Sequence, residues 1–118
     1  MGDLPRRVAE ITGCHPAIVY MGKKEFWHIT RSHPEMRREE FQLAPWLIRD
    51  GSYYVDGRRA NQMTIYGQLE HDSKLYTLGL KSVDHGCEVW VQTMYRIDPK
   101  KAERRSRTMD QIYGPHLL

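Results

Sequence analysis

Two short polar clusters, far apart in the chain, hold the side chains that could carry out chemistry. The first runs from His28 to Glu35 and contains two imidazoles, those of His28 and His33. Imidazole is the side chain that titrates near neutrality, so it can both accept and donate protons at physiological pH. The second cluster is Thr93 and Tyr95, preceded along the chain by Lys81. Two residues apart in a strand, the hydroxyl and the phenol would share a face.

This set of groups suits the cleavage of RNA without a metal. A base must remove the proton from a 2′-hydroxyl, and an acid must protonate the departing 5′-oxygen. A cation or a hydrogen-bond donor must stabilise the charge that develops on the phosphorus oxygens. His28, His33, Lys81, Thr93 and Tyr95 together supply these functions. We therefore predict that they line one cleft, as catalytic residues of a metal-independent endoribonuclease.

The same residues allow plainer interpretations. Thr93 and Tyr95 are types that strands favour for packing alone. His28, beside Phe26 and Trp27, could be a half-buried core histidine, and His33-Pro34-Glu35 could simply begin a helix. A zinc site is a further alternative, built from Cys14-His15 and His85-Gly86-Cys87, although this spacing fits no common zinc module. We predict no metal and no cofactor.

The composition is typical of one folded domain, which we expect to span residues 1–118. The chain has 40% hydrophobic and 28% charged residues, a net charge of +3 and a pI near 9.0. No apolar stretch is long enough to span a bilayer, so we expect no membrane partner. Two cysteines do not define a disulfide framework, so we expect a reducing compartment. We also expect a monomer. Positive charge is concentrated between residues 96 and 107, and this concentration indicates a phosphate-binding rim. The predicted RNA-binding residues are Arg31, Arg96, Lys100, Lys101 and Arg104.

The first half of the chain is predicted to be mainly helical. Apolar spacing indicates helices over residues 4–12 and 23–32, with a strand over 17–21 between them. Pro34 should end the second helix, so that His28 lies on it and His33 at its C-terminal corner. A helical pattern resumes over 35–50, where Pro45 should kink the helix or begin a second one.

The second half is predicted to form an antiparallel meander. Alternating residues indicate strands over 53–55, 62–70, 74–81 and 88–97, joined by short polar turns at 56–57, 71–73 and 84–86. In the last strand, Val89, Val91, Thr93 and Tyr95 are expected on one face. The tail from Pro99 is predicted to be a helix that ends at Gly114-Pro115. Helices followed by antiparallel strands give an α+β fold, with N-terminal helices packed on a curved antiparallel sheet.

Residues 26–36 and 75–97 together resemble the toxin-type RNases grouped as barnase–EndoU–colicin–RelE nucleases. The likeness rests on Trp27, Ile29 and His33-Pro34-Glu35, followed by Leu80-Lys81 and the Val91-x-Thr93-x-Tyr95 strand. The most similar forms occur in phage proteins and at the C-termini of delivered polymorphic toxins. The resemblance implies a barnase-like α+β fold and cleavage of RNA, tRNA or another cellular RNA, to a 2′,3′-cyclic phosphate.

The family's residues map onto this chain position by position. Its helical histidine corresponds to His28 or His33, its strand lysine to Lys81, and its Thr-x-Tyr to Thr93 and Tyr95. Which histidine is the base stays open; His28 is favoured because His33 precedes a proline and could instead contact a phosphate.

The resemblance also implies where the protein acts and what restrains it. A delivered toxin would act in the cytoplasm of a target cell. A dedicated immunity protein would protect the producer, and an acidic surface would suit it to a basic cleft. The alternative function is a module of the same fold that binds RNA or a protein without cutting it.

Overall fold

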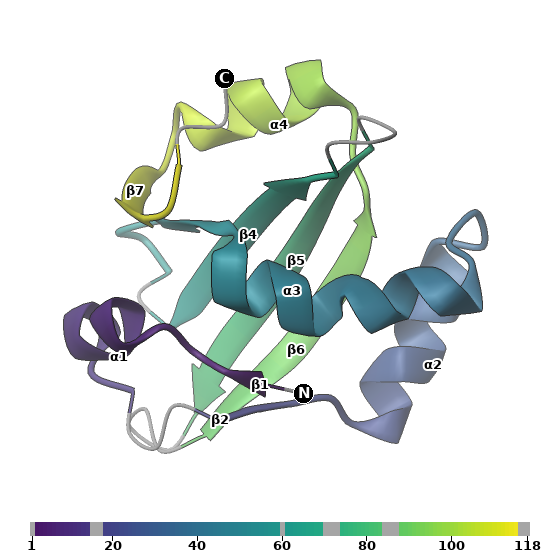
Figure 1. The fold of residues 1–118 in the computed structure, drawn as a ribbon, viewed down its shortest axis with the longest axis horizontal. Helices are drawn as coiled ribbons and strands as arrows, with labels where there is room; N and C mark the ends of the chain where they lie inside the picture. Colours follow the sequence, from purple (N-terminus) through teal and green to yellow (C-terminus); the bar gives the residue numbers. More distant parts are fainter. Residues whose placement is uncertain (1, 15–17, 60, 70–73, 84–87, 116–118) are drawn as a thin grey trace.

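The computed structural model describes residues 2–14, 18–59, 61–69, 74–83 and 88–115. Its strands join a single seven-stranded sheet, and the fold is α+β as predicted (Figure 1). The strands are β1 (Gly2–Asp3), β2 (Ile18–Tyr20), β3 (Ser52–Val55), β4 (Gln62–Gln68), β5 (Leu75–Val83), β6 (Glu88–Arg96) and β7 (Asp110–Tyr113). Their order across the sheet is β1-β2-β6-β5-β4-β3-β7.

The meander from β3 to β6 is antiparallel, as the sequence indicated. The predicted turn at 56–57 lies between β3 and β4, whereas the turns at 71–73 and 84–86 fall outside the described residues. One pair departs from the prediction, because β2 lies parallel to β6. These two strands are separated by more than sixty residues, so no tight turn constrains their direction and the intervening helices and strands form the crossover.

In the part of the chain that the structure describes, five helical segments accompany the sheet. They are α1 (Arg6–Thr12), α2 (Lys23–Ser32), the 3₁₀ helix η1 (Arg38–Leu43), α3 (Ala44–Asp50) and α4 (Pro99–Ser106). The predicted helices over 4–12 and 23–32 are confirmed. Pro45 lies in the first turn of α3, where a missing N–H costs nothing, so it begins a second helix rather than kinking one.

The predicted helical tail is wrong beyond residue 106. Helix α4 ends at Ser106, and residues 110–113 form β7, which pairs antiparallel with β3. The edge of the sheet supplies these residues with backbone hydrogen-bond partners that periodicity cannot reveal. Tyr113 also packs edge-on against the buried Tyr53, with ring centres 5.9 Å apart.

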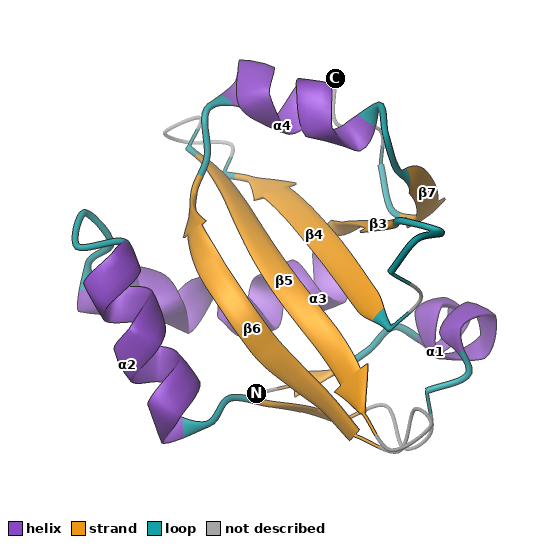
Figure 2. Cartoon of the chain, turned by 180° about the vertical axis from the view of Figure 1, so that it is seen from behind, coloured by secondary structure: helices purple, strands orange, loops and turns teal. Residues whose placement is uncertain are grey.

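The two faces of the sheet are covered unequally. Helices α1, α3, η1 and part of α2 pack on one face and form the main core with β4, β5 and β6. The opposite face carries a smaller apolar cluster under α4, made of Tyr54, Tyr66, Leu75, Ile97 and Ala102. Figure 2 looks onto this second face, with α2 along one side and α4 across one end. Within the described ranges, every helix is too short or too polar to cross a membrane.

Candidate functional site

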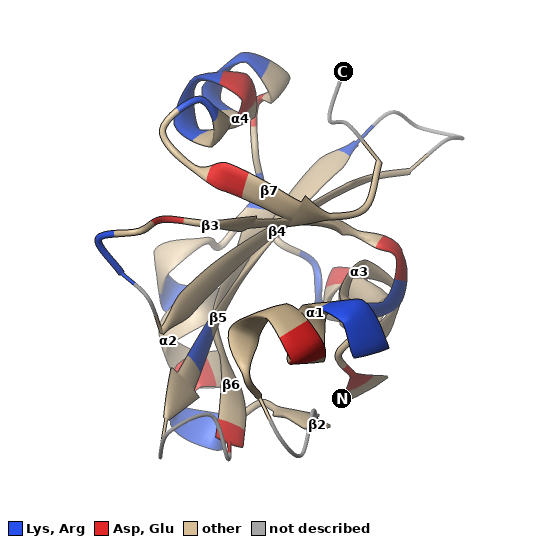
Figure 3. Cartoon of the chain, turned by 90° about the vertical axis from the view of Figure 1, so that its left-hand side faces the viewer, with Lys and Arg blue, Asp and Glu red and all other residues tan. Residues whose placement is uncertain are grey.

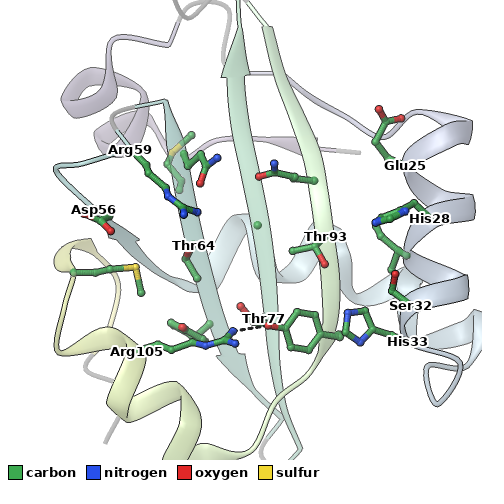
Figure 4. Close-up of a pocket in the computed structure, with 18 of the residues that line it drawn as sticks. Glu25, His28, Ser32, His33, Asp56, Arg59, Thr64, Thr77, Thr93 and Arg105 are labelled. Carbon is green, nitrogen blue, oxygen red and sulfur yellow. Dashed lines mark hydrogen bonds between the residues drawn. The ribbon is translucent and has the colours of Figure 1, made fainter.

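A cleft of about 1100 Å³ opens on the second face of the sheet. Strands β4, β5 and β6 form its floor, α2 forms one wall, and α4 with the loop after β3 forms the other (Figure 4). Of the strand residues that line it, Thr64, Thr77 and Thr93 lie outside the main core, whereas Met63 belongs to it. The cleft therefore lies on the face of the sheet that α1, α3 and η1 do not cover.

Cross-strand pairing arranges polar groups in two rows on this floor. Thr64, Gly79 and Thr93 are direct partners across β4, β5 and β6. Tyr66, Thr77 and Tyr95 form the next row. Direct partners in antiparallel strands project from the same face, so each row places its side chains next to one another.

Gly79 makes a hollow in the middle of the first row. A Cβ atom added there would lie 2.9 Å from Cγ2 of Thr93, closer than real contacts allow. With hydrogen at this position, the Cγ2 methyl of Thr93 lies against the backbone of β5, and Thr64 and Thr93 line the cleft on either side of Gly79 (Figure 4). The hydroxyls of these two cleft-lining threonines are neutral hydrogen-bond donors, which suit an oxygen-rich ligand.

An irregularity in β6 decides which residues face the cleft. Gly79 pairs with Thr93, but Leu80 pairs with Val91, so Gln92 is an extra residue in the ladder. Val91 and Met94 are fully buried in the main core, whereas Gln92, Thr93 and Tyr95 line the cleft. The prediction that Val89 and Val91 share a face with Thr93 and Tyr95 is therefore wrong. The bulge moves the last two to the opposite face.

Helix α2 presents the two histidines from one wall. Ile29 is 1% exposed in the main core and anchors the helix against the sheet. His28 and Ser32, four residues apart on the helix, project toward the strands in Figure 4. His33 caps the helix, as the proline after it indicated, and it also lines the cleft. Both histidines thus lie where the sequence placed them.

His33 is held more firmly than His28. Its ring stacks on that of Tyr95, with centres 4.2 Å apart and planes 12° apart. Its Nδ1 lies 3.4 Å from Oε1 of Glu35. A carboxylate at Nδ1 favours a hydrogen on that nitrogen and leaves Nε2 for a substrate. His28 is exposed, so its side chain is freer to adjust to a bound molecule.

The opposite wall contains two arginines that the sequence analysis did not single out. Arg105 of α4 donates a 2.6 Å hydrogen bond to the hydroxyl of Tyr95, drawn as a dashed line in Figure 4. Arg59, in the loop after β3, lines the cleft near Asp56. Hydrogen bonds from the backbone N–H and the guanidinium of Arg58 lower the pKa of Asp56, so this carboxylate is engaged by Arg58. Arg59 lines the cleft as a second cation, and its charge also lowers the pKa of Asp56.

One signal in the sequence could have identified Arg105. It lies three residues after Ala102, the buried residue of α4, and residues three apart share one side of a helix. Figure 3 shows that basic residues make up much of α4, so only their spacing from Ala102 distinguishes the one that faces the cleft.

Tyr66, at the end of the floor, stays neutral over the physiological range. Burial raises its pKa to about 12, although the nearby charge of Arg105 acts in the opposite direction. Its phenol is therefore a hydrogen-bonding group and not a base.

Lys81 is not among the residues that line the cleft, contrary to prediction. It pairs with Gln62 and therefore emerges from the same face of the sheet, but at the far end of the floor. Lys100, Lys101 and Arg104 are exposed on α4 and likewise lie outside the lining, whereas Arg31 is part of it.

Arg96 lies on the other face of the sheet. Its Nε is 3.3 Å from Oε2 of Glu40 in η1, and its guanidinium also donates to the carbonyl of Glu35. Burial alone would raise the pKa of Glu40, but hydrogen bonds from Tyr76 and from the N–H of Arg37, together with the charge of Arg96, outweigh burial and lower it. Arg96 thus joins η1 to the sheet on the face away from the cleft, and its role in binding RNA stays a prediction.

The zinc alternative falls mostly on residues that are not described. His15, His85 and Cys87 lie outside the described ranges, and Cys14 is a buried free cysteine. Among the residues that the structure describes, no three His, Cys, Asp or Glu side chains are grouped to hold a metal ion.

The cleft therefore combines two imidazoles, three guanidinium groups and a threonine-lined hollow between them. Comparisons of the chain with family models, with curated proteins and with solved structures found no match.

Proposed function

We propose that this cleft cleaves RNA by attack of a 2′-hydroxyl on the neighbouring phosphorus, without a metal. The observation that carries the proposal is the arrangement across the cleft. His28 and His33 stand on one wall, Arg105 stands on the other, and the threonine hydroxyls lie between them. This is the set of groups that an in-line transfer at phosphorus requires, disposed around a space large enough for a nucleotide.

The scissile phosphate would sit over the hollow at Gly79. Thr64 and Thr93 would donate hydrogen bonds to its non-bridging oxygens, while Arg105 would approach from the side of α4. Arg105 is already oriented by its hydrogen bond to Tyr95, so little reorganisation would accompany the reaction. In this arrangement Arg105 and Arg59 take the role of stabilising charge that the sequence analysis gave to Lys81.

The two histidines would exchange protons with the reacting oxygens. One removes the proton of the 2′-hydroxyl as the bond from O2′ to phosphorus forms. The other gives a proton to O5′ as its bond to phosphorus breaks. The products are a 2′,3′-cyclic phosphate and a free 5′-hydroxyl, and all atoms and protons are accounted for without a cofactor.

We assign the acid to His33 and the base to His28. Glu35 at Nδ1 and the stacked ring of Tyr95 hold the His33 imidazole in one orientation, which suits delivery of a proton to a fixed leaving oxygen. The freer side chain of His28 can follow a ribose hydroxyl.

The first experiment is cleavage of labelled single-stranded RNA in excess EDTA by wild type, His28→Ala and His33→Ala. Wild type should release fragments with 2′,3′-cyclic ends, and each variant should be slower by roughly 10²–10⁴-fold. Arg49→Ala is a control, because Arg49 is an exposed arginine on α3, outside the cleft. Retardation of RNA without fragments would instead indicate a binding module. Activity lost in EDTA and restored by zinc would indicate a metal hydrolase.

A second substrate separates the acid from the base. A ribonucleoside 3′-phosphate ester with a p-nitrophenolate leaving group needs no proton on departure. The defect of His33→Ala should largely disappear with this substrate, whereas that of His28→Ala should persist. The opposite pattern would exchange the two assignments.

A further inference from the structure

Trp27 is the most exposed of the large hydrophobic side chains in the described part of the chain. It is 65% exposed, compared with 48% for Ile11, 41% for Tyr20 and 40% for Ile18. Single exposed apolar residues are common on protein surfaces and need no explanation by themselves. Trp27 differs from the other three because it lines the cleft.

A second side chain accompanies the indole. Arg31, one helical turn later, places its guanidinium carbon 5.6 Å from the centre of the Trp27 ring. Both residues line the cleft from α2. A helix advances about 100° per residue, so the row of Trp27 and Arg31 lies directly beside the row of His28 and Ser32. The inner row points toward the sheet, and the outer row forms the adjacent rim.

Charge around the cleft favours an anionic occupant. Among the described residues, its lining includes Lys24, Arg31, Arg59 and Arg105, against Glu25 and Asp56 as the only Asp or Glu side chains. Asp56 is engaged by Arg58, as described above. A rim that combines an exposed indole with a guanidinium offers a flat apolar face and a phosphate-binding group within one helical turn.

We propose that Trp27 and Arg31 form a binding site for an unpaired nucleobase and its phosphate, next to the reacting phosphate. This rests on the proposed function and names its substrate class, which is single-stranded RNA. A base within a duplex already stacks on its neighbours and cannot lie on an indole without leaving the helix. A flexible single strand can place one base on Trp27 while its backbone continues over Gly79.

Binding is measured without cleavage by using a 2′-O-methyl oligonucleotide, which lacks the attacking hydroxyl. Trp27→Ala should weaken binding of this single strand by roughly 5- to 100-fold, the range that loss of one base–aromatic stack gives. Trp27→Phe should retain most of the affinity because it keeps a ring. Tyr20→Ala is the matched control, since it removes an exposed aromatic outside the cleft and should bind as wild type does.

Two further measurements test the same site. Wild type should bind a 2′-O-methyl duplex of the same sequence at least 10-fold more weakly than the single strand, since its bases are already stacked. Arg31→Ala should reduce the slope of log affinity against log salt by about one, as expected for one lost phosphate contact. Equal affinity of wild type and Trp27→Ala for the single strand, or equal affinity of wild type for single strand and duplex, would overturn the inference.

Kinetics separate failure of this inference from failure of the proposed function. With cleavable single-stranded RNA, Trp27→Ala should raise KM and leave kcat within about 3-fold of wild type, because a remote base contact is made equally before and during the reaction. Normal KM in Trp27→Ala, with active wild type, would reject the base site alone. Absence of cleavage by wild type, with Trp27-dependent binding intact, would reject the catalysis and keep the base site.

Discussion

Tyr95 links the two walls of the cleft. Its ring lies against the imidazole of His33, and its hydroxyl accepts a hydrogen bond from Arg105. The residue was expected to act through its phenol, beside Thr93. The contacts indicate a different role, in which Tyr95 fixes the positions of a histidine and an arginine that come from separate helices.

The two contacts of Tyr95 can be separated by substitution. Tyr95→Phe keeps the stacked ring and removes the acceptor for Arg105, so we expect kcat for RNA cleavage to fall by roughly 10-fold, with KM nearly unchanged. Tyr95→Ala removes both contacts and should lower kcat by a further 10-fold or more. Steady-state kinetics on single-stranded RNA measure both. A Phe variant as impaired as the Ala variant would show that ring stacking contributes nothing.

At the scale of elements, the bulge in β6 determines which side chains reach the site. Regular alternation would place Val91 and Thr93 on one face, but the extra residue Gln92 separates them. A bulge arises from how two strands are paired, and residue types along one strand do not specify it. Thr93 and Tyr95 therefore line the cleft as expected, although the expected assignment of faces was incorrect.

Reciprocal substitutions test the bulge. Val91→Thr places a hydroxyl in the main core and should lower the free energy of unfolding by about 1–3 kcal/mol. Thr93→Val changes a cleft residue of the same shape, so stability should change by less than about 1 kcal/mol while kcat falls. Urea unfolding and RNA cleavage give the two readouts. Equal loss of stability in both variants would mean that both side chains face the core.

Helix η1 is tied to the sheet by a charge-dependent contact. The pKa of Glu40 is lower in the folded protein than in an unfolded chain, so its contribution to stability is present at neutral pH. That contribution is lost as pH falls from the ordinary glutamate pKa, near 4.5, through the lower folded value. Glu40→Gln should lower stability at pH 7 by about 1 kcal/mol, since its hydrogen bonds lose their charge.

The pH dependence provides the sharper readout. Urea unfolding between pH 3 and pH 7 should show a shallower acid decline for Glu40→Gln than for wild type. Glu39→Gln, at an exposed neighbouring position in η1, is the control and should follow wild type. Parallel pH profiles for wild type and Glu40→Gln would show that Glu40 carries no charge-dependent stability.

At the scale of the whole molecule, the sheet separates the face that carries the main core from the face that carries the cleft. The main core fixes α2 and the central strands, and α4 closes one end of the other face through Ala102. The cleft that remains is open and carries more Lys and Arg than Asp and Glu. A protein that inhibits the proposed activity would need to cover this face.

We expect such an immunity protein to present acidic side chains to the cleft. Opposite charges accelerate association, so the association rate should fall by more than 10-fold as salt is raised from low to high concentration. Arg59→Ala and Arg105→Ala should each slow association at low salt, whereas Arg49→Ala, on the other side, should not. Stopped-flow binding measures these rates. An association rate indifferent to salt would rule out electrostatic guidance.

Most helices and strands, and most residues that line the cleft among those expected there, could be predicted from residue spacing alone. Helical spacing predicted that His28 lies on α2 and His33 at its C-terminal end, and alternating residues predicted β3 to β6. Both patterns can be predicted because each reflects the one buried face of a local element. Residue spacing could not predict the strand in the tail, the parallel β2–β6 pair, the bulge at Gln92, the contacts of Arg96 and Arg105, or the distance of Lys81 from the cleft. Each of these depends on a partner supplied by a distant segment, and neither periodicity nor composition along one segment carries that information.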